Sequence, residues 1–172
     1  MAWAPDCFIK GSCTTTDMNR VFSLQKKAIR YVCGLSQRES CKEHFKLLGV
    51  LTVPSLYVLE VCLVAKKNLN MFKRVGDNHA YDTRNRDRLE IPEHRTNRYE
   101  LKPTYRGARF YDGLPEHIKN VKVLSKFKAA LKKHLLDTCS YSVLEFTESC
   151  VWHLFIVTQL SHWNCIMYFS FF

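Results

Sequence analysis

Residues 56–65 are apolar at almost every position, and this run constrains the fold more than any other feature of the 172-residue chain. Thr52 can cap a helix that begins here, and Pro54 would lie in its first turn, where a missing backbone N–H is tolerated. A helix that is apolar nearly all round has to be covered by the rest of its domain. The sequence therefore predicts a helix that runs from about Thr52 toward Leu69 and forms the centre of the core.

Two helices are predicted on the N-terminal side of this run. The first is capped by Asp17 and ends at Gly34, where a left-handed residue is expected. Helical spacing predicts an inward face made of Val21, Leu24, Ala28 and Val32, with Phe22 and Ile29 beside them. Ser40 and Glu43 have the spacing of a capping box, which predicts a short second helix that ends at Gly49.

The C-terminal half is predicted to be less regular. Residues 73–111 mix charged residues with Asn, Pro and Gly and hold no period for long, so we expect a long Arg-rich irregular segment with one short strand near residues 89–91. A short helix is expected after Pro115. Ser125 is expected to cap a Lys-rich helix, and Ser142 with Glu145 is expected to cap one further helical turn. The inward residues of the Lys-rich helix are predicted to be Phe127, Leu131 and Leu135. The predicted fold class is mainly α, a small helical cluster without internal repeats.

The positive charge is distributed very unevenly along the sequence. All 26 Lys and Arg residues precede His134, whereas residues 134–172 contain three acids and no Lys or Arg, and the formal net charge is +10. A segment that basic attracts polyanions, and binding that displaces their counterions depends on salt. This balance favours RNA or DNA as a partner.

Two basic regions are candidates for that contact. In the irregular segment, arginines alternate with tyrosines, and such side chains grip phosphates and stack on unpaired bases. In the Lys-rich helix, an outer lysine face suits a phosphate backbone. The candidate nucleic-acid-binding residues are Tyr81, Arg84, Arg86, Arg88, Arg106, Arg109, Lys126, Lys128, Lys132 and Lys133. Six acids between residues 77 and 100 require that some of these arginines are paired internally. A solvated, salt-bridged surface is the alternative interpretation of both regions.

The motifs of common catalytic sites are missing from the sequence. There is no paired-carboxylate site for two metal ions, no phosphate-cradling glycine loop and no nucleophile elbow. We therefore expect no enzymatic activity and no cofactor. Cys41 with His44, and Cys150 with His153, have spacings that suit zinc, but the pairs are more than a hundred residues apart, and free thiols in a reducing compartment are the simpler expectation.

The two ends of the chain differ from its middle. Residues 1–15 are interpreted as a loose leader without a secretory signal, and residues 16–146 as one domain. Residues 147–172 are interpreted as an apolar tail, which carries no charged residue after Glu148. We expect an intracellular protein, in the cytoplasm or the nucleus. The tail allows three interpretations: a weak membrane anchor, a helix packed on the domain, or translated sequence that was never selected as protein. Polar residues such as His153, Gln159 and Asn164 make the anchor unfavourable.

Four blocks of this sequence follow one another in a familiar order. They are residues 20–30 (RVFSLQKKAIR), 45–57 (FKLLGVLTVPSLY), 79–85 (HAYDTRN), and 113–116 (GLPE) with its continuation through residues 141–146 (YSVLEF). Together they resemble the region that follows the polymerase core in reverse transcriptases of jockey-like non-LTR retrotransposons of insects. The resemblance covers about residues 13–146.

This resemblance implies an origin in an RNA-directed DNA polymerase. In that family the catalytic aspartates lie upstream of the region matched here, so the resemblance carries no polymerase activity to any residue of this chain. It implies instead a contact role toward template RNA or target DNA. Proteins of the family tend to stop soon after the last block, so residues 147–172 are interpreted as read-through of a truncated element copy. A small protein anchored to a membrane by its tail is the alternative function.

Overall fold

The computed structural model describes residues 15–77, 81, 86–91, 93–100 and 102–148. Its helices in chain order are α2 (Thr15–Cys33), α3 (Lys42–Leu47), α4 (Val53–Lys67), α5 (Asn97–Glu100), α6 (Pro103–Asp112), α7 (Glu116–Lys119) and α8 (Leu124–Thr138). Two 3-10 turns, η1 (Leu69–Met71) and η2 (Val75–Asp77), follow α4. The only β pairing among the described residues is an isolated antiparallel bridge between Arg74 and Leu89. The mainly α fold class is confirmed.

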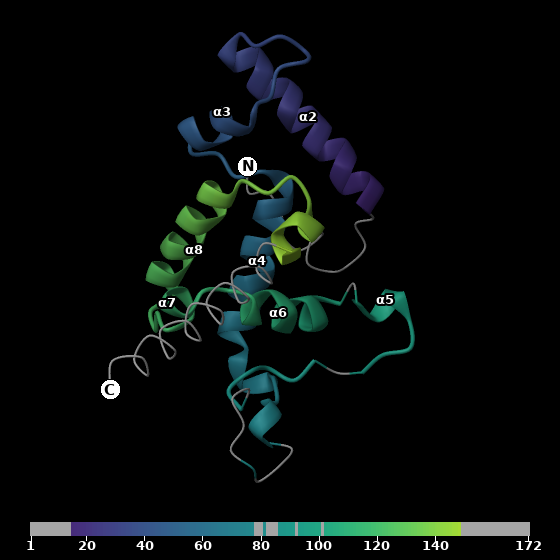
Figure 1. Cartoon of the computed structure of the whole chain (residues 1–172), viewed down its shortest axis with the longest axis vertical. Coiled ribbons are helices and arrows are strands. Elements are labelled where there is room, and N and C mark those ends of the chain that lie inside the picture. Colours follow the sequence, from purple (N-terminus) through teal and green to yellow (C-terminus); the bar gives the residue numbers. More distant parts are fainter. Residues whose placement is uncertain (1–14, 78–80, 82–85, 92, 101, 149–172) are drawn as a thin grey trace, which may run out of the picture.

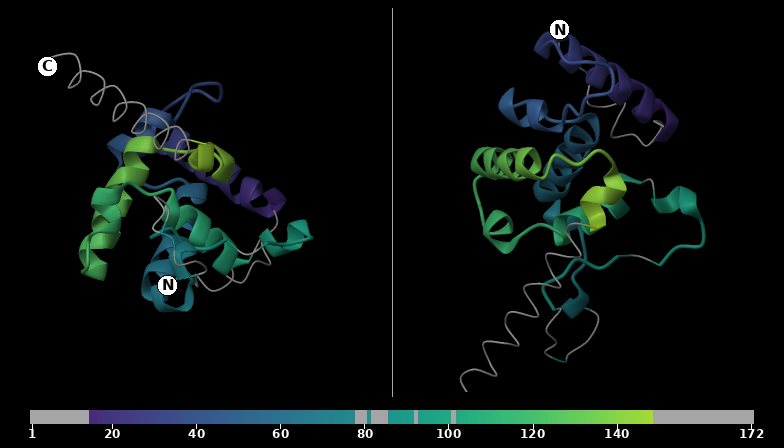
Figure 2. Two further views of the ribbon diagram at one scale, coloured as in Figure 1. Left: turned by 60° about the horizontal axis from the view of Figure 1, so that its bottom comes forward. Right: turned by 45° about the horizontal axis from the view of Figure 1, so that its top comes forward.

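Helix α4 is the centre of the molecule, as predicted. It packs against α6, α8 and α2, which approach it from different sides (Figures 1 and 2). Val58, Val61 and Cys62 on this helix are at most 1% exposed. The predicted cap is also present, because the Thr52 hydroxyl accepts a hydrogen bond from the Ser55 N–H at 3.3 Å and Pro54 lies in the first turn. Burial of a helix on several sides explains why its sequence is apolar on several sides.

The predicted apolar face of α2 is wrong at Leu24, Ala28 and Val32 and right at Phe22 and Ile29. Leu24 is 64% exposed and Val32 is 70% exposed, whereas Met18, Phe22 and Ile29 are buried. This helix carries two adjacent apolar stripes, and helical spacing alone does not say which one is used. Partners from distant parts of the chain decide, because the Phe22 ring lies 5.1 Å from Tyr141 and 6.2 Å from Phe45. The end of the helix was predicted correctly, since Gly34 has a φ of +65°.

The predicted capping box of α3 does not form. The helix begins at Lys42, whose N–H lies 3.4 Å from the Ser40 hydroxyl, and the residue before the helix, Cys41, provides no side-chain cap. The Cys41 side chain is instead buried at 1% exposure. The end of the helix is as predicted, at Gly49, with a φ of +63°.

The segment 73–111 is more regular than its sequence indicates. Residues 103–112 form α6, which places Ala108 and Phe110 in the core at 0% and 2% exposure. Gly107 allows a close approach to α4, since a Cβ there would lie 3.3 Å from the Cβ of Ala65. The strand predicted near residues 89–91 is reduced to the bridge at Leu89. The helical period was missed because α6 presents arginines between its buried aromatic residues.

The C-terminal elements largely follow the prediction. Phe127, Leu131 and Leu135 on α8 are all 0% exposed, and α7 follows Pro115. The predicted cap is wrong, because Val123 precedes the helix and Ser125 lies inside it. The helix ends at Cys139, which has a left-handed φ of +45° although it is not a glycine. A further helical turn begins after Ser142, whose hydroxyl accepts the Glu145 N–H at 3.0 Å, as predicted.

Candidate nucleic-acid interface

The outer face of α8 carries four of the predicted contact residues. Lys126, Lys128, Lys132 and Lys133 are all exposed, because the apolar face of the helix is turned toward α4. Lys126 and Lys133 are seven residues apart and therefore share one edge of the helix. Lys128 and Lys132 are four residues apart and share another. The exposed Ala129 lies between the two edges. The small side chain of Ala129 is therefore flanked on both sides by lysine side chains.

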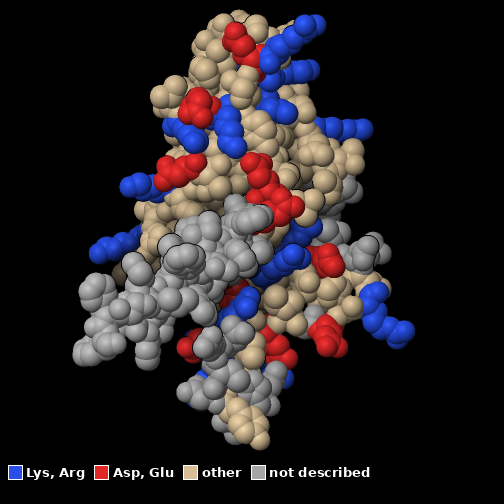
Figure 3. Space-filling model, viewed as in Figure 1, with Lys and Arg blue, Asp and Glu red and all other residues tan. Residues whose placement is uncertain are grey.

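The four lysines form no close ion pair within the described residues, although Asp137 lies four residues after Lys133 on the same helix. Figure 3 shows Lys and Arg atoms along the outer edge of α8 at the left of the view. Exposed ammonium groups of this kind are available to the phosphates of a nucleic acid.

Two predicted arginines instead hold the fold together. The Arg88 Nε donates to the Asp112 carboxylate at 3.4 Å, and the other oxygen of this buried carboxylate accepts the Leu89 N–H at 3.2 Å. Arg106 donates to the Glu100 carbonyl at 3.1 Å and to the Tyr57 hydroxyl at 3.1 Å. The expectation that some arginines are paired internally is therefore confirmed.

The remaining predicted residues are more accessible. Arg109 is exposed on α6, Tyr81 is 80% exposed, and Arg86 is exposed with its aliphatic stem against Gly76. Arg84 lies outside the described residues. The four lysines lie together on α8, whereas Arg109 belongs to α6, and Tyr81 and Arg86 belong to the segment between α4 and α5. The described candidates therefore come from three different parts of the chain.

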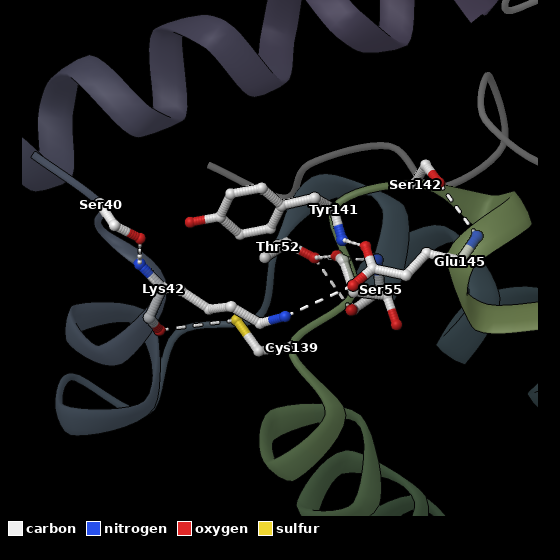
Figure 4. A network of polar contacts seen from close by, with 9 residues as sticks. Ser40, Lys42, Thr52, Ser55, Cys139, Tyr141, Ser142 and Glu145 are labelled. Atoms are coloured by element: carbon white, nitrogen blue, oxygen red, sulfur yellow. Dashed lines mark hydrogen bonds and ion pairs between the residues drawn. The ribbon is translucent and has the colours of Figure 1, made fainter. Parts of the chain in front are cut away.

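A partly buried polar network joins α3, α4 and the end of α8 (Figure 4). The Thr52 hydroxyl lies 2.7 Å from the Ser140 carbonyl and 2.9 Å from the Ser55 hydroxyl. The Glu145 carboxylate accepts the Tyr141 N–H at 2.6 Å, and its other oxygen lies 3.4 Å from the Lys42 Nζ. The contacts of Thr52 with Ser140 and of Lys42 with Glu145 join residues 88 and 103 positions apart, so the network stabilises the fold.

Two titratable groups of this network are held in their neutral forms. Burial is the main reason that the pKa of the Tyr141 hydroxyl is raised above its ordinary value, and a hydrogen bond with the Cys41 thiol adds to this. Burial also raises the pKa of the Cys139 thiol, against a smaller opposing effect of Lys42. A thiol that resists ionisation is a poor nucleophile. Cys139 is therefore a structural residue.

These shifts predict a loss of stability at alkaline pH. The unfolded chain releases these protons near the ordinary pKa values of 9.0 for the thiol and 10.0 for the phenol, whereas the folded protein retains them. The free energy of unfolding should therefore be unaffected by these groups below pH 9 and fall above it, by at most about 1.4 kcal/mol per pH unit for each group. Urea unfolding between pH 7 and 10.5 measures this fall. For the variant Tyr141→Phe, the free energy of unfolding should fall less steeply with pH. The same slope in the variant and the unaltered protein would contradict the raised pKa of Tyr141.

The structure offers no support for a metal site or a membrane-spanning helix in the part of the chain that it describes. No group of three or more His, Cys, Asp or Glu residues is placed there to hold a metal ion. No helix among those residues has the length and apolar character needed to cross a bilayer. Cys150, His153 and the apolar tail lie outside the described residues.

Comparison with known proteins identifies no relative. No family model, curated protein or solved structure matches this chain. The resemblance to the retrotransposon enzymes therefore depends on the four sequence blocks, and functional arguments depend on the geometry of the molecule.

Proposed function

We propose that this chain is a non-catalytic nucleic-acid-binding domain that contacts the phosphate backbone of RNA or DNA through the outer face of α8. The observation that supports this most directly is the row of four exposed lysines without an ionic partner among the described residues. The net charge of +10 adds a long-range attraction for polyanions. The resemblance to the region behind a reverse-transcriptase core is in keeping with this role and supplies no catalytic residue.

The geometry of α8 explains how such a contact would work. Lys126 with Lys133, and Lys128 with Lys132, present charge on both sides of Ala129, so a phosphate strand that follows the helix meets ammonium groups on either side. Lysine contacts of this kind set affinity and orientation but do not read base sequence. Arg109 on α6 is exposed and adds a further cation.

Replacement of the four α8 lysines by Gln should weaken binding to both RNA and DNA. Because each lost phosphate contact lowers the salt slope of log K by about 0.7 for single strands, we expect the slope to decrease by about 3 and the affinity in 0.1 M salt to fall on the order of a hundredfold or more. Fluorescence anisotropy with a labelled single-stranded RNA and a DNA duplex, each at several salt concentrations, measures both quantities.

A matched control removes the same positive charge from residues outside α8. Arg20, Lys27, Arg38 and Lys46 are exposed on α2, on α3 and in the loop between them, and their replacement by Gln should reduce the slope much less. Equal losses in the two variants would show that total charge, and not α8, determines binding. Absence of binding by the unaltered protein at low salt would contradict the proposed function as a whole.

A further inference from the structure

A pocket of about 470 Å³ opens beside the C-terminal end of α4, on a different part of the molecule from the lysines of α8. Its apolar lining comes from Val64 at the end of α4, Met71 and Phe72 at η1, and Tyr99 and Tyr105 of α5 and α6. The volume lies in the range of about 300–1,000 Å³ that is usual for small-molecule sites. A cavity of this size admits a planar ring system with an attached sugar.

The aromatic side of the pocket is rigidly held. Tyr105 is only 8% exposed, and its ring lies edge-on to Tyr99 with centroids 6.1 Å apart. His94 stacks against Tyr99 at 5.7 Å with an interplanar angle of 18° and meets Tyr105 at 4.7 Å. The three rings contact one another in the absence of a ligand. Pre-organised aromatic surfaces lose little entropy on binding and favour other flat rings.

Charged groups at the rim suit a nucleotide. Lys73 is exposed at the pocket, and the Lys102 Nζ lies 4.5 Å from the centre of the Tyr99 ring. The Lys73 ammonium group complements a phosphate of a bound nucleotide, and Lys102, which does not line the pocket itself, adds positive charge beside the Tyr99 ring. Glu90 lines the same pocket, where its backbone N–H donates to the Lys73 carbonyl at 2.8 Å. A carboxylate can accept hydrogen bonds from the amino or imino groups of a base edge.

From this geometry we propose that the pocket binds an unpaired nucleobase. A base within a duplex is stacked and paired and cannot enter a pocket of this kind, whereas a base of a single strand can. The inference rests on the proposed function and extends it: α8 supplies affinity for any phosphate backbone, and the pocket adds a preference for single strands. Aromatic contacts with bases accept any sequence, because every base has a π face. Glu90 adds a preference for bases that carry hydrogen-bond donors.

Two substitutions at one position test the pocket. Tyr99→Leu removes the aromatic ring, and Tyr99→Phe keeps it as the matched control. We expect Tyr99→Leu to lower the affinity for a 12-nucleotide single-stranded RNA by about 5- to 100-fold and to leave the affinity for a DNA duplex unchanged. The salt slopes should stay the same, because no phosphate contact is lost. Equal effects on both nucleic acids, or no effect on either, would overturn the inference.

A second measurement does not depend on the folding of a variant. Titration of the unaltered protein with adenosine and guanosine monophosphate should shift the methyl NMR signal of Met71, which lines the pocket. A shift caused by an apolar peptide but by neither nucleotide would identify a protein-docking site and overturn the inference. If single strands bind in a manner that depends on the α8 lysines while Tyr99→Leu has no effect, only the pocket is refuted. If no nucleic acid binds, the proposed function fails as well.

Discussion

Phe127→Ala should destabilise the protein by about 3–5 kcal/mol, the largest effect that we expect from a single truncation. The Phe127 ring is 0% exposed at the contact between α8 and α4. It lies 6.3 Å from the Tyr111 ring, and the Lys66 Nζ lies 5.2 Å from its centre. Since natural domains have a free energy of unfolding of about 5–15 kcal/mol, this loss would remove a large part of the stability of the protein. Urea unfolding followed by circular dichroism measures it.

The neighbouring exposed residue provides the control for this prediction. Lys128→Ala shortens a side chain on the same helix that faces solvent, so we expect a change within about 0.5 kcal/mol. Phe127→Leu, which leaves a smaller cavity, should fall between the two. A loss below 1 kcal/mol for Phe127→Ala would mean that α8 does not pack on α4 as described.

Thr52→Val should lower the stability by about 2–4 kcal/mol although it hardly changes the shape of the side chain. A hydroxyl has a single proton, and the Ser140 carbonyl at 2.7 Å can only accept, so the Thr52 hydroxyl donates to that carbonyl. It accepts in turn from the Ser55 N–H at 3.3 Å and lies 2.9 Å from the Ser55 hydroxyl. Valine leaves these buried groups without a partner and also removes the cap of α4.

The variant Thr52→Ser distinguishes the contribution of the Thr52 hydrogen bonds to stability from the contribution of its methyl group. The hydroxyl is retained, so we expect a loss of only about 1 kcal/mol from the missing methyl. Thermal unfolding of both variants under the same conditions gives the comparison. If serine and valine destabilise the protein equally, packing and not the network of Figure 4 makes this position important.

The predictions from local patterns were successful where a residue type has a direct local consequence. Gly34 and Gly49 end their helices in the left-handed conformation, and Thr52 caps α4. The inward face of α8 was also predicted correctly, because its apolar spacing admits a single solution. The solvent exposure of the α8 lysines follows from the same spacing. This part of the candidate interface was therefore predictable in advance.

The predictions were wrong where the chain offers two local solutions. Helix α2 has a stripe through Phe22 and Ile29 and another through Leu24 and Val32, and only contacts with Phe45 and Tyr141 select the first. Helix α6 was missed because arginines interrupt its aromatic residues. The roles of Arg88 and Arg106 depend on the same contacts, since their partners Asp112 and Tyr57 are 24 and 49 residues away in sequence.

By itself, the sequence determined a helical protein built around one apolar helix, its helix-ending glycines and an exposed row of lysines, because these follow from side-chain chemistry within a few residues. Only the tertiary structure decided which stripe of α2 is buried, which arginines are tied to carboxylates and carbonyls, and that apolar and aromatic residues of α4, η1, α5 and α6 meet around a pocket. These features depend on pairs of residues that are distant in sequence. Their energies arise from contacts and desolvation that form only when the helices pack together.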